Sequence, residues 1–256
     1  MNSELLKVKN IVKDAGKIAL QHFNKVTGYT KSDGTLVSNV DFTIESFLIT
    51  NLKNVFGEIN IIGEESGCGS FKVALPITIA IDPLDGTAAF LSGLPVWAIS
   101  IGIFFHREIT SGVIYLPLLD ELYWYDGKYS YWGDKVLPVL SSSEELGSED
   151  FLAVPSDAHR SLDLRGFAGK TRSMGSIAAH LVYVAKGVAK GAIVKGYPWD
   201  LAGGFAILKG VKGCCEYVFS DRGVELFSLF PSSPVPEPII ATSFNLIKIF
   251  KAIIKK

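Results

Sequence analysis

The stretch ITIAIDPLDGT, residues 77–87, carries most of the information about this chain of 256 residues. Its first five, largely apolar residues predict a short buried strand that ends at Asp82. Pro83 disfavours helical backbone angles at the residue before it, so a turn is expected there. That turn can bring the Asp82 and Asp85 carboxylates to one side of the chain and aim the Leu84 carbonyl the same way.

The end of the same stretch predicts the start of a short helix. Gly86 has no side chain, so it lets the backbone approach a ligand closely. The N–H groups of Gly86 and Thr87 can then bind phosphate oxygens, as helix N-termini do. Thr87 adds a hydroxyl group that can orient a water molecule. The competing interpretation is an acidic turn that only caps a helix.

Two further acidic segments follow apolar, strand-like runs. The sequence GEES, residues 63–66, comes after a short apolar run, and WDLAGG, residues 199–204, comes after a second one. Carboxylates gathered at strand ends repel one another unless cations lie between them, and Mg²⁺ prefers oxygen ligands. The sequence therefore predicts a multi-metal site that acts on a phosphate. The five carboxylates concerned are those of Glu64, Glu65, Asp82, Asp85 and Asp200.

These acidic residues also have ordinary structural interpretations. A Glu-Glu pair such as Glu64 and Glu65 is usually found in a solvated loop. Asp200 has the position of an N-cap for the helix that follows it, and one side chain can serve both as a cap and as a metal ligand. The metal interpretation is favoured because the three acidic segments occur together.

Composition excludes several classes of protein. A chain of this length, with 48% hydrophobic residues, can bury a sizeable core. No apolar run approaches the ~18 charge-free residues of a membrane span. A formal net charge of −1 argues against a nucleic-acid polymer as partner. Three cysteines without a Cys-x-x-Cys pair, and a start without a secretory signal, favour the reducing cytoplasm.

Hydrophobic periodicity predicts both helices and strands in the first half of the chain. Two amphipathic helices, the first capped by Ser3, are expected before the first strand. The predicted elements are helices over 3–24 and 40–55, short buried strands over 60–62 and 77–81, and an antiparallel meander from Trp97 to Trp132.

A polar connection from Ser141 to Asp150 is the best candidate for a boundary between two halves. After it we expect helices over 176–186 and 201–208, strands over 192–194 and 215–219, and a final helix capped by Ser243. This mixture predicts a layered α+β architecture. The N-terminal half, 1–140, would carry Glu64 and the 82–87 motif. The C-terminal half, 141–256, would supply Asp200 and pack with the first as one globular unit.

The three acidic segments resemble the pattern of the inositol monophosphatase family of Mg²⁺-dependent, lithium-sensitive phosphatases. The family pattern is Gly-Glu-Glu, Asp-Pro-x-Asp-Gly-Thr and Trp-Asp-x-Ala-Gly, and all three parts occur here in that order. The resemblance covers essentially the whole chain. It implies a layered α/β/α/β/α sugar-phosphatase fold, a phosphomonoesterase acting on a small sugar or polyol phosphate, and a homodimer that is not bound to a membrane.

The resemblance also implies which residues hold the metal ions. Glu64, Asp82 and the Leu84 carbonyl would bind one Mg²⁺, and Asp82, Asp85 and Asp200 would bind a second. The two ions would clamp the nucleophile and the leaving oxygen of an in-line displacement. A third, weaker Mg²⁺ near Glu64 is implied as well.

The catalytic residues implied by the resemblance are Thr87, Asp41 and Glu65. The segment from Leu36 to Glu45 resembles the family stretch whose Asp hydrogen-bonds the catalytic Thr, so Asp41 and Thr87 would together remove a proton from the attacking water. Glu65 would lie just outside the metal ligands. An Asp at a helix start is otherwise ordinary.

Substrate contacts are implied at a further segment, Met174-Gly175-Ser176, although Gly and Ser at a helix start are equally common as caps. The implied substrate-binding set is Asp85, Gly86, Thr87, Gly175, Ser176 and Asp200.

One departure from the family pattern bears on the substrate. Many inositol-specific members carry an acidic residue shortly before the Trp-Asp, whereas residues 193–197 here contain no acid and include Lys195. A second anionic group on the substrate therefore fits the sequence. Fructose-1,6-bisphosphate stays open beside inositol-1-phosphate, and a 3′-phosphoadenosine 5′-phosphate nucleotidase is an alternative. A catalytically dead regulatory homologue is the remaining alternative, and the five retained carboxylates argue against it.

Overall fold

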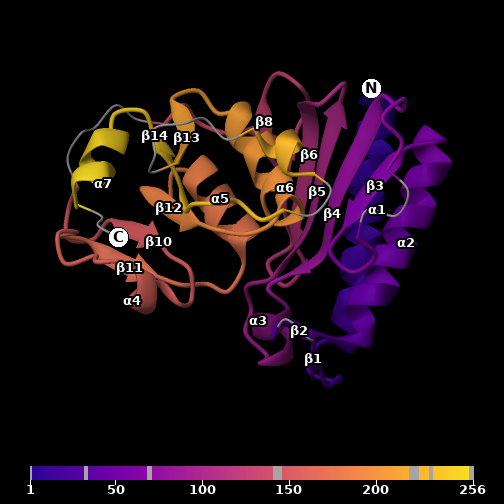
Figure 1. The fold of residues 1–256 in the computed structure, drawn as a ribbon, viewed down its shortest axis with the longest axis horizontal. Helices are drawn as coiled ribbons and strands as arrows, with labels where there is room; N and C mark the ends of the chain where they lie inside the picture. Colours follow the sequence, from indigo (N-terminus) through magenta and orange to yellow (C-terminus); the bar gives the residue numbers. More distant parts are fainter. Residues whose placement is uncertain are drawn as a thin grey trace.

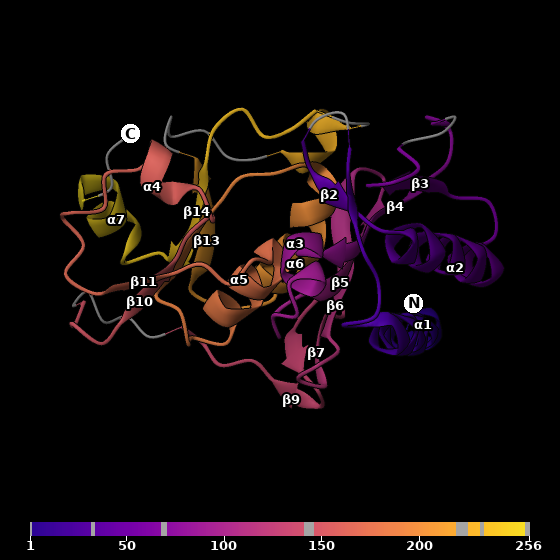
Figure 2. The same ribbon diagram turned by 90° about the horizontal axis from the view of Figure 1, so that it is seen from below.

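The computed structural model describes residues 2–31, 34–67, 71–140, 146–218, 225–230 and 233–253. Figure 1 shows layers of helices and sheets that alternate from one end of the molecule to the other: helices, a sheet, helices, a second sheet and short helices. Figure 2 shows the same order from below. The layered α/β/α/β/α architecture expected for this chain is confirmed.

The first layer consists of α1 (Asn2–His22) and α2 (Asn39–Phe56), which pack on the first sheet. Both helices were predicted within about two residues, but the expected cap of the first is wrong. Ser3 lies inside α1, because the helix already includes Asn2. The cap of α2 is Ser38, whose Oγ accepts a hydrogen bond from Val40 N at 3.2 Å.

The second layer is a seven-stranded sheet in the order β3-β4-β5-β6-β7-β8-β9. Strands β3 and β4 are parallel, and all later neighbours are antiparallel, so the predicted meander is confirmed. A separate small hairpin of β1 (Tyr29–Thr30) and β2 (Leu36–Val37) connects α1 to α2. The strands of the large sheet are β3 (Asn60–Gly63), β4 (Ile77–Asp85), β5 (Ala98–Phe105), β6 (Glu108–Leu116), β7 (Glu121–Tyr125), β8 (Ser130–Trp132) and β9 (Lys135–Val136).

Strand β4 is longer than predicted, because it continues through Asp82 to Asp85. Its pairing with β5 shifts between these two residues, where three steps along β4 match two along β5. Pro83 has no N–H to give to the sheet, so the chain bulges instead of turning out. The short helix expected next is α3 (Thr87–Leu91).

The third layer consists of α5 (Ile177–Ala185) and α6 (Pro198–Lys209), which lie between the two sheets. Helix α6 contacts β4, β5 and β6 on one side and β13 on the other. This close approach needs glycines in the sheet, since a Cβ on Gly102 would lie 2.4 Å from Ala202 Cβ. A Cβ on Gly112 would lie 2.5 Å from Ala206 Cβ.

The fourth layer is a five-stranded sheet in the order β11-β10-β12-β14-β13, and α4 (Ala158–Ser161) and α7 (Ile247–Ile253) cover its outer face. The expected cap of the final helix is wrong, because Ser243 pairs with Cys214 inside the sheet. Its strands are β10 (Phe151–Ala153), β11 (Lys170–Arg172), β12 (Gly191–Val194), β13 (Cys214–Val218) and β14 (Ile239–Ser243), and a short 3₁₀ helix (Leu226–Leu229) lies between the last two.

The two sheets come from different parts of the chain, 60–136 and 151–243. We propose that residues 1–140 and 141–256 are two halves of one unit, since α5 and α6 share a hydrophobic core with the first sheet. Residues 141–145 of the predicted connection lie outside the described residues. In the part of the chain that the structure describes, no helix combines the length and apolar character needed to cross a membrane.

Candidate active site

Three carboxylates from three elements meet at the end of strand β4. Glu64 directly follows β3, Asp82 lies in β4 and Asp200 lies in the first turn of α6. One oxygen of each carboxylate lies within 4.8 Å of the others. The first two come together because β3 and β4 are parallel, so their carboxyl ends share one edge, and Glu64 N donates a hydrogen bond to Ile81 O at 3.3 Å.

Asp200 reaches this place because packing on the first sheet and a proline together fix where α6 begins. The helix lies close against the sheet, and Pro198 begins its first turn. The Oδ2 atom of Asp200 accepts a hydrogen bond from Tyr197 N at 2.7 Å. The predicted N-cap position of Asp200 is wrong, because α6 begins three residues earlier than expected and its N-cap is Tyr197. Asp200 instead belongs to the first turn, where its side chain binds the N-cap backbone and also belongs to the carboxylate group.

The electrostatics of the group favour a bound cation. Burial raises the pKa of Asp82 and of Asp200 well above the ordinary value, and the neighbouring carboxylates raise it further. For the same reasons, burial first, the pKa of Glu64 rises to about 7. Carboxylate oxygens at such distances fit a hard divalent cation, which would remove their mutual repulsion. The donor set thus fits the predicted Mg²⁺.

Asp85 lies beside this group but is directed at the start of α5. Its oxygens accept hydrogen bonds from Ser176 Oγ at 2.6 Å, from Ile177 N at 3.1 Å and from Ala178 N. Burial raises the pKa of Asp85 to about 6, although these donors oppose the rise. Each carboxylate oxygen has two lone pairs, so the same side chain keeps the capacity to bind a metal.

The expected substrate segments face each other at this point. Gly86 has a φ of 99°, a conformation that favours glycine, and it is the N-cap of α3. A Cβ on Gly86 would lie 2.7 Å from Gly175 O. Ser176 is the N-cap of α5, with Ala179 N donating to its Oγ at 3.0 Å. The capping interpretation is thus correct for Ser176, which also binds Asp85, and Gly175 lies against Gly86.

Thr87 and Asp41 are brought together as expected. Thr87 Oγ1 lies 2.9 Å from Asp41 Oδ1 and 3.1 Å from Leu84 O. Asp41 is completely buried, and its Oδ2 accepts hydrogen bonds from Ser38 N at 2.8 Å and Ser38 Oγ at 2.7 Å. These two donors fix the carboxylate so that the other oxygen faces Thr87.

Two residues at the site were missed by the sequence analysis. Lys31 Nζ lies 2.8 Å from Glu65 Oε1 and 3.5 Å from Glu64 Oε1. Burial lowers the pKa of Lys31, but the two carboxylates outweigh burial and raise it. Lys31 stands in a segment without a motif, so nothing in the sequence indicated it. Glu45 lies on α2 and contacts the turn that contains Glu64 and Glu65; its spacing of four residues from Asp41 could have indicated it.

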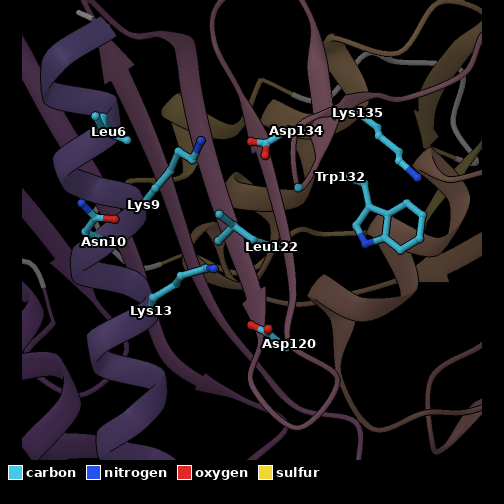
Figure 3. A pocket seen from close by; sticks show the side chains of 10 residues that line it. Leu6, Lys9, Asn10, Lys13, Asp120, Leu122, Trp132, Asp134 and Lys135 are labelled. Atoms are coloured by element: carbon cyan, nitrogen blue, oxygen red, sulfur yellow. The ribbon is translucent and has the colours of Figure 1, made fainter.

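A separate hollow of about 480 Å³ lies between α1 and the β7–β9 edge of the first sheet (Figure 3). Lys9 and Lys13 project from α1 towards it, and Asp120 and Asp134 lie on its other side. Lys9 Nζ also lies 3.7 Å from the centre of the Trp124 ring. The described residues that line the hollow include no member of the carboxylate site, so the two are distinct.

Comparison with known proteins agrees with this geometry. The model of the inositol monophosphatase family matches residues 1–229. The inositol monophosphatase 3 of Solanum lycopersicum is 35% identical over 229 residues, covering 83% of this chain and 84% of that protein. The fructose-1,6-bisphosphatase/inositol-1-monophosphatase of Aquifex aeolicus is 30% identical over 223 residues, covering 82% and 83%.

Among solved structures, the extragenic suppressor protein SuhB of Bartonella henselae has the same fold, with a TM-score of 0.83 over 98% of this chain and 97% of that one. Its sequence identity is 24%, so it shows the fold alone. The family match covers most of the chain and includes every residue of the carboxylate site. The chain therefore belongs to the inositol monophosphatase family of phosphatases.

Proposed function

We propose that the protein is a Mg²⁺-dependent phosphomonoesterase that hydrolyses a small sugar or polyol phosphate. The observation that carries the proposal is the meeting of Glu64, Asp82 and Asp200 within 4.8 Å, next to the hydrogen-bonded Thr87 and Asp41. The family membership of the chain supports the same class of reaction.

The proposed metal ligands are Glu64, Asp82, the Leu84 carbonyl, Asp85 and Asp200, for two or three Mg²⁺ ions. When bound, these ions supply the charge that neutralises phosphate oxygens and activates a water molecule. The carboxylates themselves contribute burial and fixed positions. The capping bonds of Asp85 and Asp200 hold both side chains in place before any ligand arrives.

The proposed catalytic pair moves one proton. The Thr87 hydroxyl would orient the attacking water and accept a proton from it, while it passes its own proton to Asp41 Oδ1, 2.9 Å away. Ser38 would stabilise the acceptor through its two hydrogen bonds to Asp41 Oδ2. Glu65, paired with Lys31, would lie near the attacking water and help to position it. Gly86, Gly175 and Ser176 would border the substrate.

The proposed substrates are inositol-1-phosphate and fructose-1,6-bisphosphate. The relatives from tomato and Aquifex are named for the first of these activities or for both, which supports a small phosphorylated polyol or sugar. A homodimer in the cytoplasm, without a nucleic-acid or membrane partner, is part of the same proposal. Light scattering of the purified protein tests the dimer.

A second candidate is a 3′-phosphoadenosine 5′-phosphate nucleotidase. One observation favours it: the rings of Tyr197 and Trp199 stack at 4.6 Å with an angle of 5°, and Tyr197 remains 37% exposed. Because Tyr197 N binds Asp200, this aromatic pair stands next to the carboxylate site. An exposed aromatic ring can stack on a nucleobase, typically for about 1–3 kcal/mol.

The test is phosphate release from inositol-1-phosphate, fructose-1,6-bisphosphate and 3′-phosphoadenosine 5′-phosphate, each with Mg²⁺ and with a chelator. We expect Mg²⁺-dependent release from at least one of the two sugar-type substrates. Asp82→Asn is the control that keeps the shape of the site and removes one buried charge. Equal release by this variant, or release that does not need Mg²⁺, would refute the proposal.

A further inference from the structure

The turn that carries Glu64 is held by a buried carboxylate from α2. Glu45 is only 2% exposed, and both of its oxygens face the turn. Its Oε2 accepts a hydrogen bond from Glu65 N at 3.0 Å, and its Oε1 accepts one from Ser66 N at 2.7 Å. One carboxylate therefore binds two consecutive peptide N–H groups directly after Glu64.

Gly63 shows how closely this carboxylate lies against the turn. A Cβ on Gly63 would lie 2.6 Å from Glu45 Cδ and 2.6 Å from Glu45 Oε2. The turn is also closed on itself, because Gly63 N donates to Gly67 O at 2.9 Å. The position thus has room for the Glu45 carboxylate or for a side chain on residue 63, but not for both.

The same face of α2 holds the other part of the site. Asp41 and Glu45 are four residues apart, so their side chains lie on one side of the helix. Asp41 binds Thr87, which follows β4, and Glu45 binds the turn that follows β3. A single rigid helix therefore sets the distance between Thr87 and Glu64.

We propose that Glu45 is a positioning residue, which holds the turn after β3 so that Glu64 faces Asp82 and Asp200. The inference rests on the proposed function for its effect on Mg²⁺ binding, while its effect on the turn is independent of that function. A carboxylate suits the task because it only accepts hydrogen bonds. An amide at the same place would turn an NH₂ donor towards one of the two N–H donors.

The first measurement is hydrogen exchange of the peptides that contain residues 63–67, in wild type and Glu45→Gln. We expect exchange of the Glu65 and Ser66 amides to become at least ~10-fold faster, as the loss of one charge-assisted hydrogen bond predicts. Glu58→Gln is the matched control, because its exposed carboxylate pairs with Lys72 instead of the turn. Unchanged exchange in Glu45→Gln would overturn the inference.

The second measurement is calorimetric titration of Mg²⁺ without substrate. We expect Mg²⁺ to bind Glu45→Gln at least ~10-fold more weakly, with kcat at saturating Mg²⁺ within about threefold of wild type. A loss of kcat with unchanged Mg²⁺ affinity would overturn the inference, since displacement of Glu64 must lower the affinity for Mg²⁺.

Two further variants cover the case in which Glu45→Gln does not fold. The added methyl group of Gly63→Ala would contact the same carboxylate and should lower the Mg²⁺ affinity in the same way. The Mg²⁺ affinity of Glu45→Asp should lie between those of wild type and Glu45→Gln. Wild-type Mg²⁺ binding by both would overturn the inference. If the wild type itself releases no phosphate, the proposed function fails, and the amide exchange still decides the role of Glu45.

Discussion

Thr87 donates its hydroxyl hydrogen to Asp41 over 2.9 Å, although the two residues are 46 positions apart in the sequence. Asp41 comes from α2 in the outermost layer, whereas Thr87 begins α3 at the end of β4. The bond is buried, and the second oxygen of Asp41 is occupied by Ser38. Asp41 therefore offers the Thr87 proton a fixed acceptor, in addition to the Leu84 carbonyl 3.1 Å from the same hydroxyl.

The first prediction concerns this pair as a single proton-accepting unit. Thr87→Ala, Asp41→Asn and the double variant should leave similar residual activity, because residues that act together do not lose activity additively. Thr43→Ala is the control, since its hydroxyl donates to Asn39 O within α2. Steady-state kcat is the measurement. Multiplicative losses in the double variant would mean that the two residues act separately.

The second prediction concerns Asp85, which we propose both binds metal and caps α5. Asp85→Asn keeps the shape and removes the charge, so kcat should fall at least ~10²-fold, as for loss of one charge-stabilising group. The melting temperature should fall too, because an amide cannot accept all the bonds from Ser176, Ile177 and Ala178. Ser176→Ala removes one of these bonds and keeps the charge, so its kcat should fall less than that of Asp85→Asn. Near-normal turnover of Asp85→Asn at saturating Mg²⁺ contradicts the metal role.

The third prediction concerns pH. The pKa of Glu64 is raised from 4.5 to about 7, so without metal this group costs folding stability as the pH rises between these values, and the cost is complete above about 7. Asp82 and Asp200 add to the cost, since their pKa values are also raised. Mg²⁺ needs the ionised carboxylates, so it should stabilise the protein more at high pH than at low pH.

The measurement for this prediction is the melting temperature with and without Mg²⁺, at about pH 5.5 and about pH 8. We expect the rise caused by Mg²⁺ to be larger at the higher pH by at least ~3 °C, which corresponds to about 1 kcal/mol in a protein of this size. Taking the difference at each pH cancels groups that Mg²⁺ binding leaves unchanged. His180 is such a group, because burial lowers its pKa to about 4 and it is therefore uncharged in the folded protein at both pH values. Asp82→Asn should remove most of the difference, and a rise that is independent of pH would contradict the model.

The fourth prediction concerns substrate choice at Lys195. Lys195 is exposed directly after β12, in the segment before Trp199 that contains no acidic residue, so this segment offers a cation. Lysine binds phosphate as a point charge, so kcat/KM for fructose-1,6-bisphosphate should be higher than kcat/KM for inositol-1-phosphate. The gain should weaken with added salt, because an exposed charge is screened.

The ratio of kcat/KM for the two substrates is the measurement, in wild type and Lys195→Ala. We expect a ratio above one that falls in the variant, while Lys128→Ala, in the exposed turn before β8, leaves it unchanged. A wild-type ratio below one, or a ratio that Lys195→Ala does not move, would remove Lys195 from substrate recognition and leave the metal ligands untouched.

Much of the fold and of the site was predictable from local features of the sequence. Apolar runs of strand length gave β3 and the start of β4, and alternation gave the meander. Glu64 and Asp82 follow two such apolar runs, and from this the sequence predicted a shared metal site. The parallel pairing of β3 and β4 explains why the two side chains meet. The errors are local as well. Serine is a common helix cap, but α1 begins before Ser3, and Ser243 is paired with Cys214 in the second sheet.

Tertiary structure alone decided how these segments serve one another. The hydrogen bonds of Asp85 to the start of α5 join residues more than 90 positions apart in the sequence. The hydrogen bonds of Glu45 to the turn after β3 join residues about 20 positions apart. Propensity and periodicity act over a few residues, whereas such contacts exist only after α2, the first sheet and α5 have packed into layers. The sequence by itself determined which carboxylates the protein has and at which element ends they stand. The packing of the layers determined that Asp85 is also a cap, that Lys31 faces Glu65, and that one helix, α2, holds both Thr87 and the turn of Glu64.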